Sequence, residues 1–537
     1  MKVRATAATE SAAGPRDVVE LPSLDHYLAR HAARLGGEAA LVFEEGTRLT
    51  YGELAAEVER YARAFTEQGI SAGDVVAVLG FSRPECFIAF LALCRISAIF
   101  LGLNPKYTAR ELAFVVSDSR PGLVLGMHSR EQAEQDAKLV ELREGPLAGV
   151  EVVTRGGTVE GLSTSLDEFL RVGAPHAAAF DATAPCAIVY TSGSTGVPKG
   201  ALLSQGGMIP SALASWEHWY GALVPQRTVA QHPINHVGWL VCECVATFVA
   251  GGTLFFRERF DAGATLRLID RERLNLWLAF PSMLILAKET PDFATCNLSS
   301  LETIALGMPA SVELMRIYRE HTGAVMCISY GLTEANGGAL TVTARDAPLE
   351  AVSTTIGRPV PGAEVRVLSL DGTPAAEGEE GELLVRDRSL FVGYLNRPDA
   401  TAAALDAGGW LHTGDVVRIR GDGELQMVGR KKEMFKSGGY NVYPTEIEAV
   451  IGSHDAVAAV AVVEVPDPLW DEVGVAYVVP REGTAVGAEE LRAYSRERLA
   501  NYKVPKRFVI AKELPQLPNG KFDKVSLRKS AKEQMDA

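Results

Sequence analysis

The sequence predicts an α/β fold: a large N-terminal domain of layered α/β subdomains with a β-rich subdomain, followed by a small mobile α+β C-terminal domain. Three observations support this prediction. A chain of 537 residues is too long for one compact core, so two or more domains are expected. Short apolar β-type runs alternate with helical stretches from about residue 22 to residue 430. After that point a compact pattern of helices and strands continues for about 100 residues, which is enough for a separate domain.

The large domain is expected to contain parallel sheets, because strands that alternate with helices normally pair in parallel. Strands are predicted at residues 75–79, 123–125, 186–189, 274–280 and 324–329. Helical spacing of apolar residues predicts helices at residues 51–68 and 109–118.

The predicted secondary structure changes after residue 360. Strand-like runs at residues 363–370, 382–385 and 416–428 are separated by Asp371-Gly372 and Asp422-Gly423, which are turn signals. This part is therefore predicted to form antiparallel hairpins. The next segments are predicted to be a helix at 444–451, strands at 456–465 and 473–479, and a helix at 488–499. We expect a loose N-terminus at residues 1–21, a large domain at 22–430 and a small domain at 431–537.

The composition excludes several classes of protein. The chain is 47% hydrophobic and 22% charged, as is usual for a globular protein, and its net charge of −14 disfavours nonspecific nucleic-acid binding. Seven cysteines, most of them in apolar runs, fit free thiols in a reducing compartment better than a disulfide framework. Residues 1–20 lack the apolar segment of a secretory signal, and no run reaches the length of a membrane span. A cytoplasmic protein without a membrane span is expected.

The segment from Tyr190 to Gly200 is the most informative motif. It reads Tyr-Thr-Ser-Gly-Ser-Thr-Gly-Val-Pro-Lys-Gly and follows an apolar run that ends at Val189. Glycines let the backbone approach a ligand, while hydroxyls, backbone N–H groups and one ammonium suit phosphate oxygens. It is not a Walker A loop, because Pro198 precedes Lys199 and Gly200 follows it. Taken alone, the segment is also compatible with a Gly/Ser-rich surface turn.

The wording of this loop resembles the signature of the adenylate-forming superfamily, which contains acyl-CoA synthetases, peptide-synthetase adenylation domains and luciferases. Four further motifs resemble those of the family and occur in the family's order: residues 329–335, 410–415, 429–444 and 514–522. The resemblance covers about residues 22–530. The chain is thereby identified as a member of this superfamily, and the acyl-CoA synthetases, or AMP-forming carboxylate–CoA ligases, are the group within it that we expect.

The resemblance implies ATP, Mg²⁺ and coenzyme A as cofactors. It assigns the ATP phosphates to the loop residues Thr191, Ser192, Gly193, Ser194, Thr195, Gly196 and Lys199. It places Tyr330, Gly331 and Gly307 at the adenine, Thr333 at the α-phosphate, and Glu334 at Mg²⁺, a metal that prefers carboxylate and phosphate oxygens. It assigns the ribose to Asp415 and Arg430.

Catalytic and coenzyme A roles follow from the same resemblance. Lys521 is expected to stabilise charge on the reacting carboxylate and the α-phosphate, with Thr333 and Glu334 as the other catalytic residues of adenylation. His236 is expected to line or gate the acyl pocket, although a histidine there is also compatible with a purely structural role. Lys432 is expected to act as the hinge between two conformations, and Gly438 and Gly439 to line the path of the pantetheine.

The substrate is predicted from the segments expected at the acyl pocket, residues 233–240, 304–309 and 329–338. These segments contain no Arg or Lys to pair with a second buried carboxylate, so we expect a monocarboxylic acid, either medium-length or branched aliphatic, or aromatic. Leu306 and Met308 replace smaller residues of the family and are expected to shorten or reshape the pocket, whereas Gly337 and Gly338 are expected to leave room for a ring or a longer chain. Two alternatives stay open: an acyl-AMP ligase that loads a carrier protein, and a catalytically degenerate ATP-binding homologue. The expected partners are the acid and coenzyme A, and a homodimer is left open.

Overall fold

The computed structural model describes residues 23–128, 132–176, 180–191, 198–369, 371–516 and 522–533. The chain divides into two compact units, one made of residues 1–365 and 385–412 and the other of residues 366–384 and 413–537. The boundary expected near residue 430 stays a prediction.

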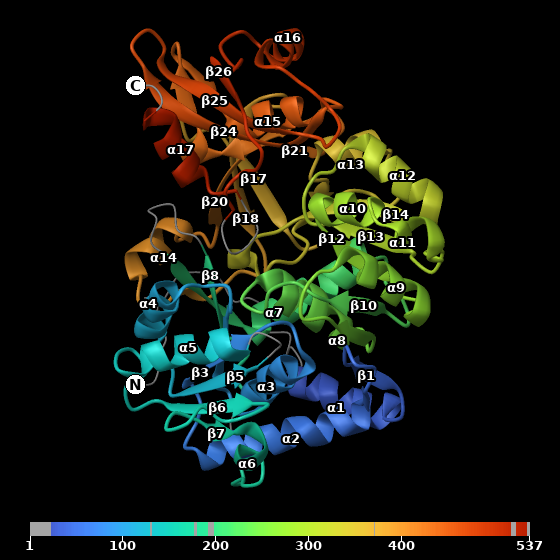
Figure 1. Cartoon of the computed structure of the whole chain (residues 1–537), viewed down its shortest axis with the longest axis vertical. Coiled ribbons are helices and arrows are strands. Elements are labelled where there is room, and N and C mark those ends of the chain that lie inside the picture. Colours follow the sequence, from blue (N-terminus) through green and yellow to red (C-terminus); the bar gives the residue numbers. More distant parts are fainter. Residues whose placement is uncertain are drawn as a thin grey trace. The chain divides into compact units, whose positions relative to one another are not determined.

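The first unit contains an eight-stranded sheet of order β19-β9-β8-β4-β3-β5-β6-β7 (Figure 1). Its strands are β3 (Val75–Gly80), β4 (Ile99–Leu103), β5 (Leu123–Met127), β6 (Glu151–Arg155), β7 (Thr164–Ser165), β8 (Pro185–Thr191), β9 (Lys199–Ser204) and β19 (Gly393–Tyr394). The helices along this part of the chain are α1 (Leu24–Leu35), α2 (Tyr51–Glu67), α3 (Pro84–Arg95), α4 (Ala109–Ser119), α5 (Gln132–Arg143), α6 (Leu166–Phe169), α7 (Gln205–Ala214) and α14 (Pro398–Ala404).

A nine-stranded sheet of order β16-β15-β14-β13-β12-β10-β11-β1-β2 completes the first unit. Its strands are β1 (Ala39–Val42), β2 (Arg48–Thr50), β10 (Arg227–Ala230), β11 (Thr253–Phe256), β12 (Leu276–Ala279), β13 (Thr303–Leu306), β14 (Val325–Tyr330), β15 (Thr341–Val342) and β16 (Arg358–Pro359). Several helices gather around β12–β14 in Figure 1. The helices along this part of the chain are the π-helices η1 (Ser215–Trp219) and η2 (Gly238–Val245), α8 (Ala246–Val249), α9 (Ala262–Glu272), α10 (Pro281–Lys288), α11 (Pro291–Thr295), α12 (Val312–Thr322), the 3₁₀-helix η3 (Thr333–Ala335) and α13 (Leu349–Thr354).

The central strands of both sheets run parallel, as the alternation of strands and helices predicts. In the eight-stranded sheet β3 pairs in parallel with β4 and β5, and in the nine-stranded sheet β10, β12, β13 and β14 pair in parallel. Antiparallel pairs occur toward the edges, where β9 joins β8 and β15 joins β14. The seven residues between β8 and β9 are too few for a parallel crossover, so this connection forms a hairpin.

Helix α3 shows how the sequence fixes the interior of the first unit. Its residues from Pro84 to Cys94 are all buried, as expected of a helix that is apolar on every side. The Phe87 ring meets Trp239 edge-on at 6.5 Å between centroids, and Trp239 stacks on Phe100 at 6.4 Å. The indole N–H of Trp239 donates a hydrogen bond of 2.8 Å to Ser82 Oγ. Trp239 therefore belongs to the hydrophobic core.

The second unit holds most of a four-stranded sheet of order β17-β18-β20-β21 and a five-stranded sheet built on a long β24–β25 hairpin. Its elements are β17 (Glu364–Leu368), β18 (Glu380–Arg386), β20 (Leu411–Ile419), β21 (Leu425–Arg430), η4 (Lys431–Glu433), β22 (Phe435–Ser437), β23 (Tyr440–Val442), α15 (Pro444–Gly452), β24 (Val457–Asp467), β25 (Asp471–Pro480), α16 (Ala488–Arg498), β26 (Arg507–Ile510) and α17 (Lys524–Glu533). The strands and helices predicted after residue 360 are present, including the antiparallel β20–β21 hairpin.

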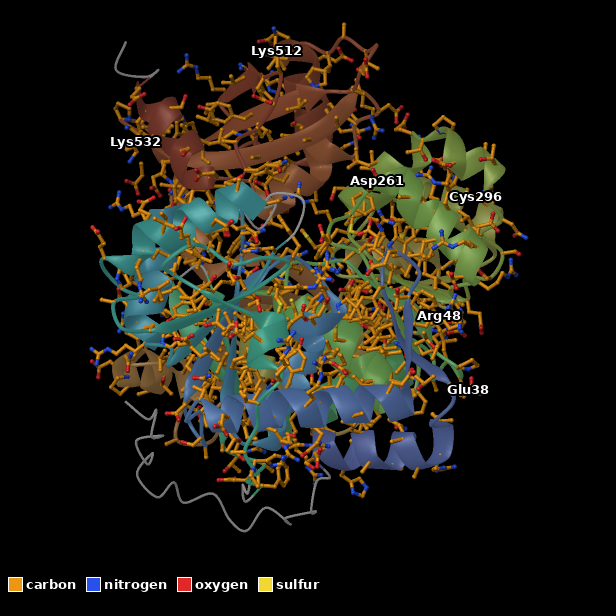
Figure 2. All side chains as sticks on the ribbon, turned by 60° about the horizontal axis from the view of Figure 1, so that its bottom comes forward. Glu38, Arg48, Asp261, Cys296, Lys512 and Lys532 are labelled. Atoms are coloured by element: carbon orange, nitrogen blue, oxygen red, sulfur yellow. The ribbon has the colours of Figure 1, made fainter. Side chains whose placement is uncertain are left out.

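The free cysteines and the exposed charged side chains are as the composition predicts. All seven cysteines are free, and all except the half-buried Cys296 are buried. Figure 2 shows charged side chains such as Arg48 and Asp261 on the outside of the first unit, and both are exposed. No helix among the described residues is long and apolar enough to cross a membrane.

Leu101, a fully buried residue of β4, tests the packing of the first unit. Its side chain belongs to the apolar cluster under the eight-stranded sheet, so Leu101→Ala leaves a cavity. We expect the free energy of unfolding to fall by about 2–5 kcal/mol, measured by urea titration followed by tryptophan fluorescence. Val172→Ala, at a half-exposed position of the same unit, should change it by less than about 0.5 kcal/mol. Equal effects of the two substitutions would contradict the assigned core.

Candidate active site

The loop expected to bind phosphate, residues 192–198, connects β8 to β9. The first five residues of β8 are buried, and the strand ends at Thr191, whose backbone pairs with Lys199 at the start of β9. Thr191 Oγ1 donates a 3.5 Å hydrogen bond to the Lys199 carbonyl. The hairpin therefore holds Thr191 and Lys199 at the two ends of the loop. The other predicted phosphate ligands lie outside the described residues: Ser192, Gly193, Ser194, Thr195 and Gly196.

Tyr394 connects this loop to Glu334. The Lys199 ammonium lies 5.0 Å from the centre of the Tyr394 ring, a cation–π contact. The Tyr394 hydroxyl donates a 2.6 Å hydrogen bond to Glu334 Oε1. Burial, together with the nearby Glu334 carboxylate, raises the pKa of Tyr394 well above its usual value, so the hydroxyl stays protonated as a donor. Three segments far apart in the sequence thus meet at one place.

Sequence reasoning missed Tyr394. It is the last residue of the short strand β19, which pairs with β9 so that Tyr394 lies opposite Ala201. The same β19 region is fixed to η3, because the Phe391 N–H donates to the Glu334 carbonyl at 2.8 Å. A lone Gly-Tyr dipeptide carries no chemical signal, so only the pairing of β19 with β9 identifies this residue.

Tyr190 contributes a second anchor on the loop. Its hydroxyl donates a 2.8 Å hydrogen bond to Asp118 Oδ2, and Asn396 Nδ2 donates 2.9 Å to the Asp118 carbonyl. Arg397 lies 3.6 Å from the same carboxylate. The strand before the loop and the chain after β19 are therefore tied to the end of α4.

The end of β14 holds Tyr330, Gly331, Thr333 and Glu334. The Tyr330 side chain is buried, while Thr333 and Glu334, both in η3, are half-buried. A Cβ at Gly331 would lie only 2.1 Å from the Gly338 carbonyl oxygen, so this close backbone approach requires glycine. These four residues follow the carboxyl end of a parallel strand, the usual position of ligands in α/β sheets.

The expectation that Gly337 and Gly338 leave room for a substrate ring is wrong. A Cβ at Gly338 would meet Ser211 Oγ at 2.0 Å, and one at Gly337 would meet the Val237 side chain at 2.7 Å. Protein atoms already occupy the space beside both glycines. Their role is to let the turn after η3 pack against α7 and against the segment before η2.

Leu306 and Met308, both expected to shape the acyl pocket, lie in different environments. Leu306 is fully buried in the core under the nine-stranded sheet, whereas Met308 is 54% exposed. Gly307, between them, is exposed, and a Cβ there would lie 2.9 Å from the Phe280 ring. The exposed positions just after β13 are therefore Gly307, Met308 and Pro309.

His236 lies just before η2 and is half-buried. Its Nδ1 accepts a 3.0 Å hydrogen bond from the Gly238 N–H, so in the neutral ring the hydrogen is on Nε2. This contact fixes the orientation of the ring and makes Nε2 a donor.

In the second unit, Asp415 and Arg430 are neighbours on the β20–β21 hairpin. They lie opposite each other in the strand register, and Arg430 Nε is 3.1 Å from Asp415 Oδ1. Asp415 is buried, whereas Arg430 and the next predicted residue, Lys432 in η4, are exposed. A buried carboxylate beside a cation at the surface is suited to accept hydrogen bonds from hydroxyl groups.

The turn at Gly438 and Gly439 lies beside aromatic and cationic side chains of the second unit. Both glycines have positive φ, 58° and 83°, and a Cβ at Gly438 would lie 2.7 Å from the Trp470 ring. The Lys506 ammonium is 4.8 Å from the centre of the Trp470 ring. Nearby, Tyr440 is 59% exposed and stacks on Tyr502 at 4.4 Å. Lys521 lies outside the described residues.

The donor set fits Mg²⁺ carried by a nucleotide. Within the described part of the chain, no group of three or more His, Cys, Asp or Glu side chains is placed to hold a metal ion. Mg²⁺ bound to nucleotide phosphates keeps several waters and needs only one or two protein carboxylates. The single Glu334, oriented by Tyr394, meets that requirement.

Comparison with known proteins agrees with this geometry. A model of the AMP-binding enzyme family matches residues 28–395, and a model of the AMP-binding enzyme C-terminal domain matches residues 446–521. The chain is 35% identical to a feruloyl-CoA synthase of an Amycolatopsis species, over 93% of this chain and 97% of that protein. It is 36% identical to the indoleacetate–CoA ligase of Aromatoleum aromaticum, over 94% of this chain and 97% of that protein.

Solved structures show the same fold. The amide bond synthetase McbA from Marinactinospora thermotolerans has a TM-score of 0.83 and 30% identity, covering 95% of this chain and 100% of that chain. ATP-bound MatB from Rhodopseudomonas palustris has a TM-score of 0.83 and 26% identity, covering 96% and 100%. These matches confirm the predicted fold class and the predicted identity as an AMP-forming acyl-CoA synthetase. The chain belongs to the AMP-binding enzymes of the adenylate-forming superfamily.

Proposed function

We propose that this enzyme activates an aromatic monocarboxylic acid with ATP and Mg²⁺ and transfers the acyl group to coenzyme A. The observation that carries the proposal is the contact of Lys199 with Tyr394 and of Tyr394 with Glu334. It places a cation for phosphate oxygens and a carboxylate for a metal beside one loop. Relatives named for feruloyl and indoleacetate substrates favour an aromatic acid.

In the first half-reaction, a carboxylate oxygen of the acid attacks the α-phosphorus of ATP, and the bond to pyrophosphate breaks. We assign the β- and γ-phosphates to Thr191, Lys199 and the loop between them, and the α-phosphate to Thr333. Lys521 stabilises the charge that develops on the reacting oxygens. Bound Mg²⁺ would neutralise phosphate charge, held by Glu334. These residues act by positioning and by electrostatic stabilisation.

Two groups of residues are proposed for the nucleoside. Tyr330, Gly331 and Gly307 are proposed at the adenine, because they follow the carboxyl ends of neighbouring strands β13 and β14. Asp415 and Arg430 are proposed at the ribose. The buried Asp415 carboxylate can accept hydrogen bonds from the ribose hydroxyls.

In the second half-reaction, the thiol sulfur of coenzyme A attacks the acyl carbonyl carbon. The bond to AMP breaks, and the thiol proton is released. We propose Lys432 as the hinge and Gly438 and Gly439 as the path of the pantetheine. The Trp470 ring and the Lys506 ammonium beside this turn suit a ligand with an aromatic base and phosphates.

A monocarboxylate is favoured over a dicarboxylate. The segments at residues 233–240, 304–309 and 329–338 contain no Arg or Lys. A second carboxylate on the substrate would be buried without a cation, which is costly. His236, with its Nε2 donor, is proposed at the acyl side.

Product analysis tests this proposal. The purified protein is incubated with ATP, Mg²⁺, coenzyme A and a panel of aromatic, aliphatic and dicarboxylic acids, and products are identified by mass spectrometry. We expect an aryl-CoA, AMP and pyrophosphate. An acyl adenylate that persists despite coenzyme A would indicate a carrier-protein acceptor instead. A dicarboxylate as the best substrate would contradict the monocarboxylate assignment, and no product from any acid would support a degenerate homologue.

Tyr394→Phe tests the organisation of the phosphate site. The substitution keeps the ring beside Lys199 but removes the hydrogen bond to Glu334. We expect adenylation to slow by about tenfold and the Mg²⁺ concentration for half-maximal rate to rise, since a hydrogen bond to a charged group contributes about 1.5–3 kcal/mol. Pyrophosphate release measured against Mg²⁺ concentration reports both. Tyr494→Phe, in α16 of the second unit, is the control, and an unchanged Mg²⁺ dependence in Tyr394→Phe would contradict the assignment.

A further inference from the structure

A buried histidine–carboxylate pair lies at the end of β10, and the proposed chemistry does not use it. His232 Nδ1 is 2.5 Å from Glu243 Oε1, and their side chains are 7% and 0% exposed. Glu243 Oε2 also accepts hydrogen bonds from the backbone N–H groups of Gln231, at 3.2 Å, and His232, at 3.3 Å. Three donors thus hold the carboxylate, and the carboxylate in turn fixes the plane of the imidazole.

The other nitrogen of the ring has no protein partner. His232 Nε2 is buried and makes no hydrogen bond to any residue that the structure describes. Because Nδ1 gives its hydrogen to Glu243, Nε2 of the neutral ring carries a lone pair and is an acceptor. A buried polar atom without a partner costs free energy, so this acceptor calls for a donor that is not part of the described protein.

The position of the ring connects it with the candidate acyl site. His232 follows β10, and its ring packs perpendicular to the ring of Phe280, which follows β12, at 5.0 Å between centroids. Phe280 in turn lies against Gly307 at the end of β13. Cys242, the residue before Glu243, has its Sγ 3.2 Å from the Gly337 carbonyl. The pair is therefore linked through Phe280 to Gly307 and through the neighbouring Cys242 to Gly337, two positions in the segments expected to border the acyl group.

A second buried histidine provides a contrast. His31 Nε2 is also buried without a hydrogen-bond partner among the described residues. Its ring packs on Tyr51 at 5.1 Å and Phe248 at 5.7 Å, among helices, and the described residues place no carboxylate in an ion pair with it. Unlike His31, His232 combines an unpartnered ring nitrogen, a carboxylate that orients the ring, and a place just after the carboxyl end of a parallel strand.

We propose that His232, oriented by Glu243, selects acids whose acyl group carries a hydrogen-bond donor, a phenolic hydroxyl or a ring N–H, which donates to Nε2. This inference rests on the proposed function and names its substrate class more closely. The Phe280 side chain beside the imidazole suits a flat ring that carries the donor. A site built to bond a hydroxyl discriminates strongly against the analogue that lacks it, because its polar group is then left unpaired.

Matched acids test the proposal. We would measure kcat/KM for acyl-CoA formation with cinnamate, 4-hydroxycinnamate and 4-methoxycinnamate, and with indole-3-acetate and its 1-methyl derivative. In at least one series the donor-bearing acid should exceed its donor-free analogue by about tenfold or more. The methyl ether separates the two directions of hydrogen bonding, since it can accept but not donate. Preference for the methyl ether over the phenol would overturn the proposal.

Three variants test whether the preference for donor-bearing acids depends on His232. His232→Leu should reduce the donor preference to within about twofold of unity while the donor-free acid is still converted. Glu243→Gln, which keeps the ring but loosens it, should reduce the preference partly and mainly through KM. His31→Leu, at the other buried histidine, should leave the preference unchanged. If His232→Leu does not fold, the donor preference is measured in two other variants. Glu243→Gln loosens the ring, and His232→Gln replaces the ring with a side chain that retains an acceptor.

The outcomes separate this inference from the proposed function. Conversion of donor-free and donor-bearing acids at equal rates by the wild type would refute the inference and leave the ligase activity standing. A donor preference that survives His232→Leu would also refute it. Failure to convert any acid would refute the proposed function and this inference with it.

Discussion

The hydrogen bond from Tyr394 to Glu334 is the contact on which the arrangement of the candidate site depends. It joins the short strand β19 to the turn after β14, and the Lys199 ammonium lies on the same tyrosine ring. Without it, the Glu334 carboxylate would have no side-chain link, among the described residues, to the loop after β8, and the backbone hydrogen bond from Phe391 to Glu334 would still join the β19 region to η3. With it, a cation and a carboxylate lie close enough to act on one nucleotide. The tyrosine, a residue with no charge of its own, sets the distance between them.

Close backbone packing explains the rest of the site. Gly331 approaches the Gly338 carbonyl, and Gly338 packs against Ser211, so the turn that carries Thr333 and Glu334 is held by contacts that only glycine permits. Substitutions are therefore tolerated poorly around η3 and better at Met308, whose side chain is largely exposed. Variation in substrate is best accommodated at the exposed end of β13 and at His232, where the side chain and not the backbone makes the contact.

Much of this could be predicted from the sequence. The alternation of apolar runs and helical stretches predicted β3, β5, β8, β12 and β14 within a few residues, because buried parallel strands are short and continuous in hydrophobicity. The resemblance to the adenylate-forming superfamily identified Lys199, Tyr330 and Glu334 as site residues, and the structure describes their surroundings, while their roles stay predictions. The loop residues Ser192–Gly196 and Lys521, which lie outside the described part of the chain, stay predictions.

Other features depend on tertiary contacts that no local pattern shows. Tyr394 is placed by a two-residue strand, and the His232–Glu243 pair joins a residue after β10 to a residue inside the π-helix η2, eleven positions further on. The role expected for Gly337 and Gly338 was wrong because a glycine can serve a close protein contact as well as an open space. Trp239, counted among the pocket segments, proved to be core for a similar reason: apolar residues look alike in sequence whether they face a ligand or the interior.

The central claim is that the acid is activated by ATP before any thiol takes part. Acid-dependent exchange of labelled pyrophosphate into ATP, measured without coenzyme A, tests it most directly. The account predicts exchange that requires the acid and Mg²⁺ and that Lys199→Ala abolishes. Formation of acyl-CoA from an acid that supports no exchange, or with release of ADP in place of AMP, would contradict it.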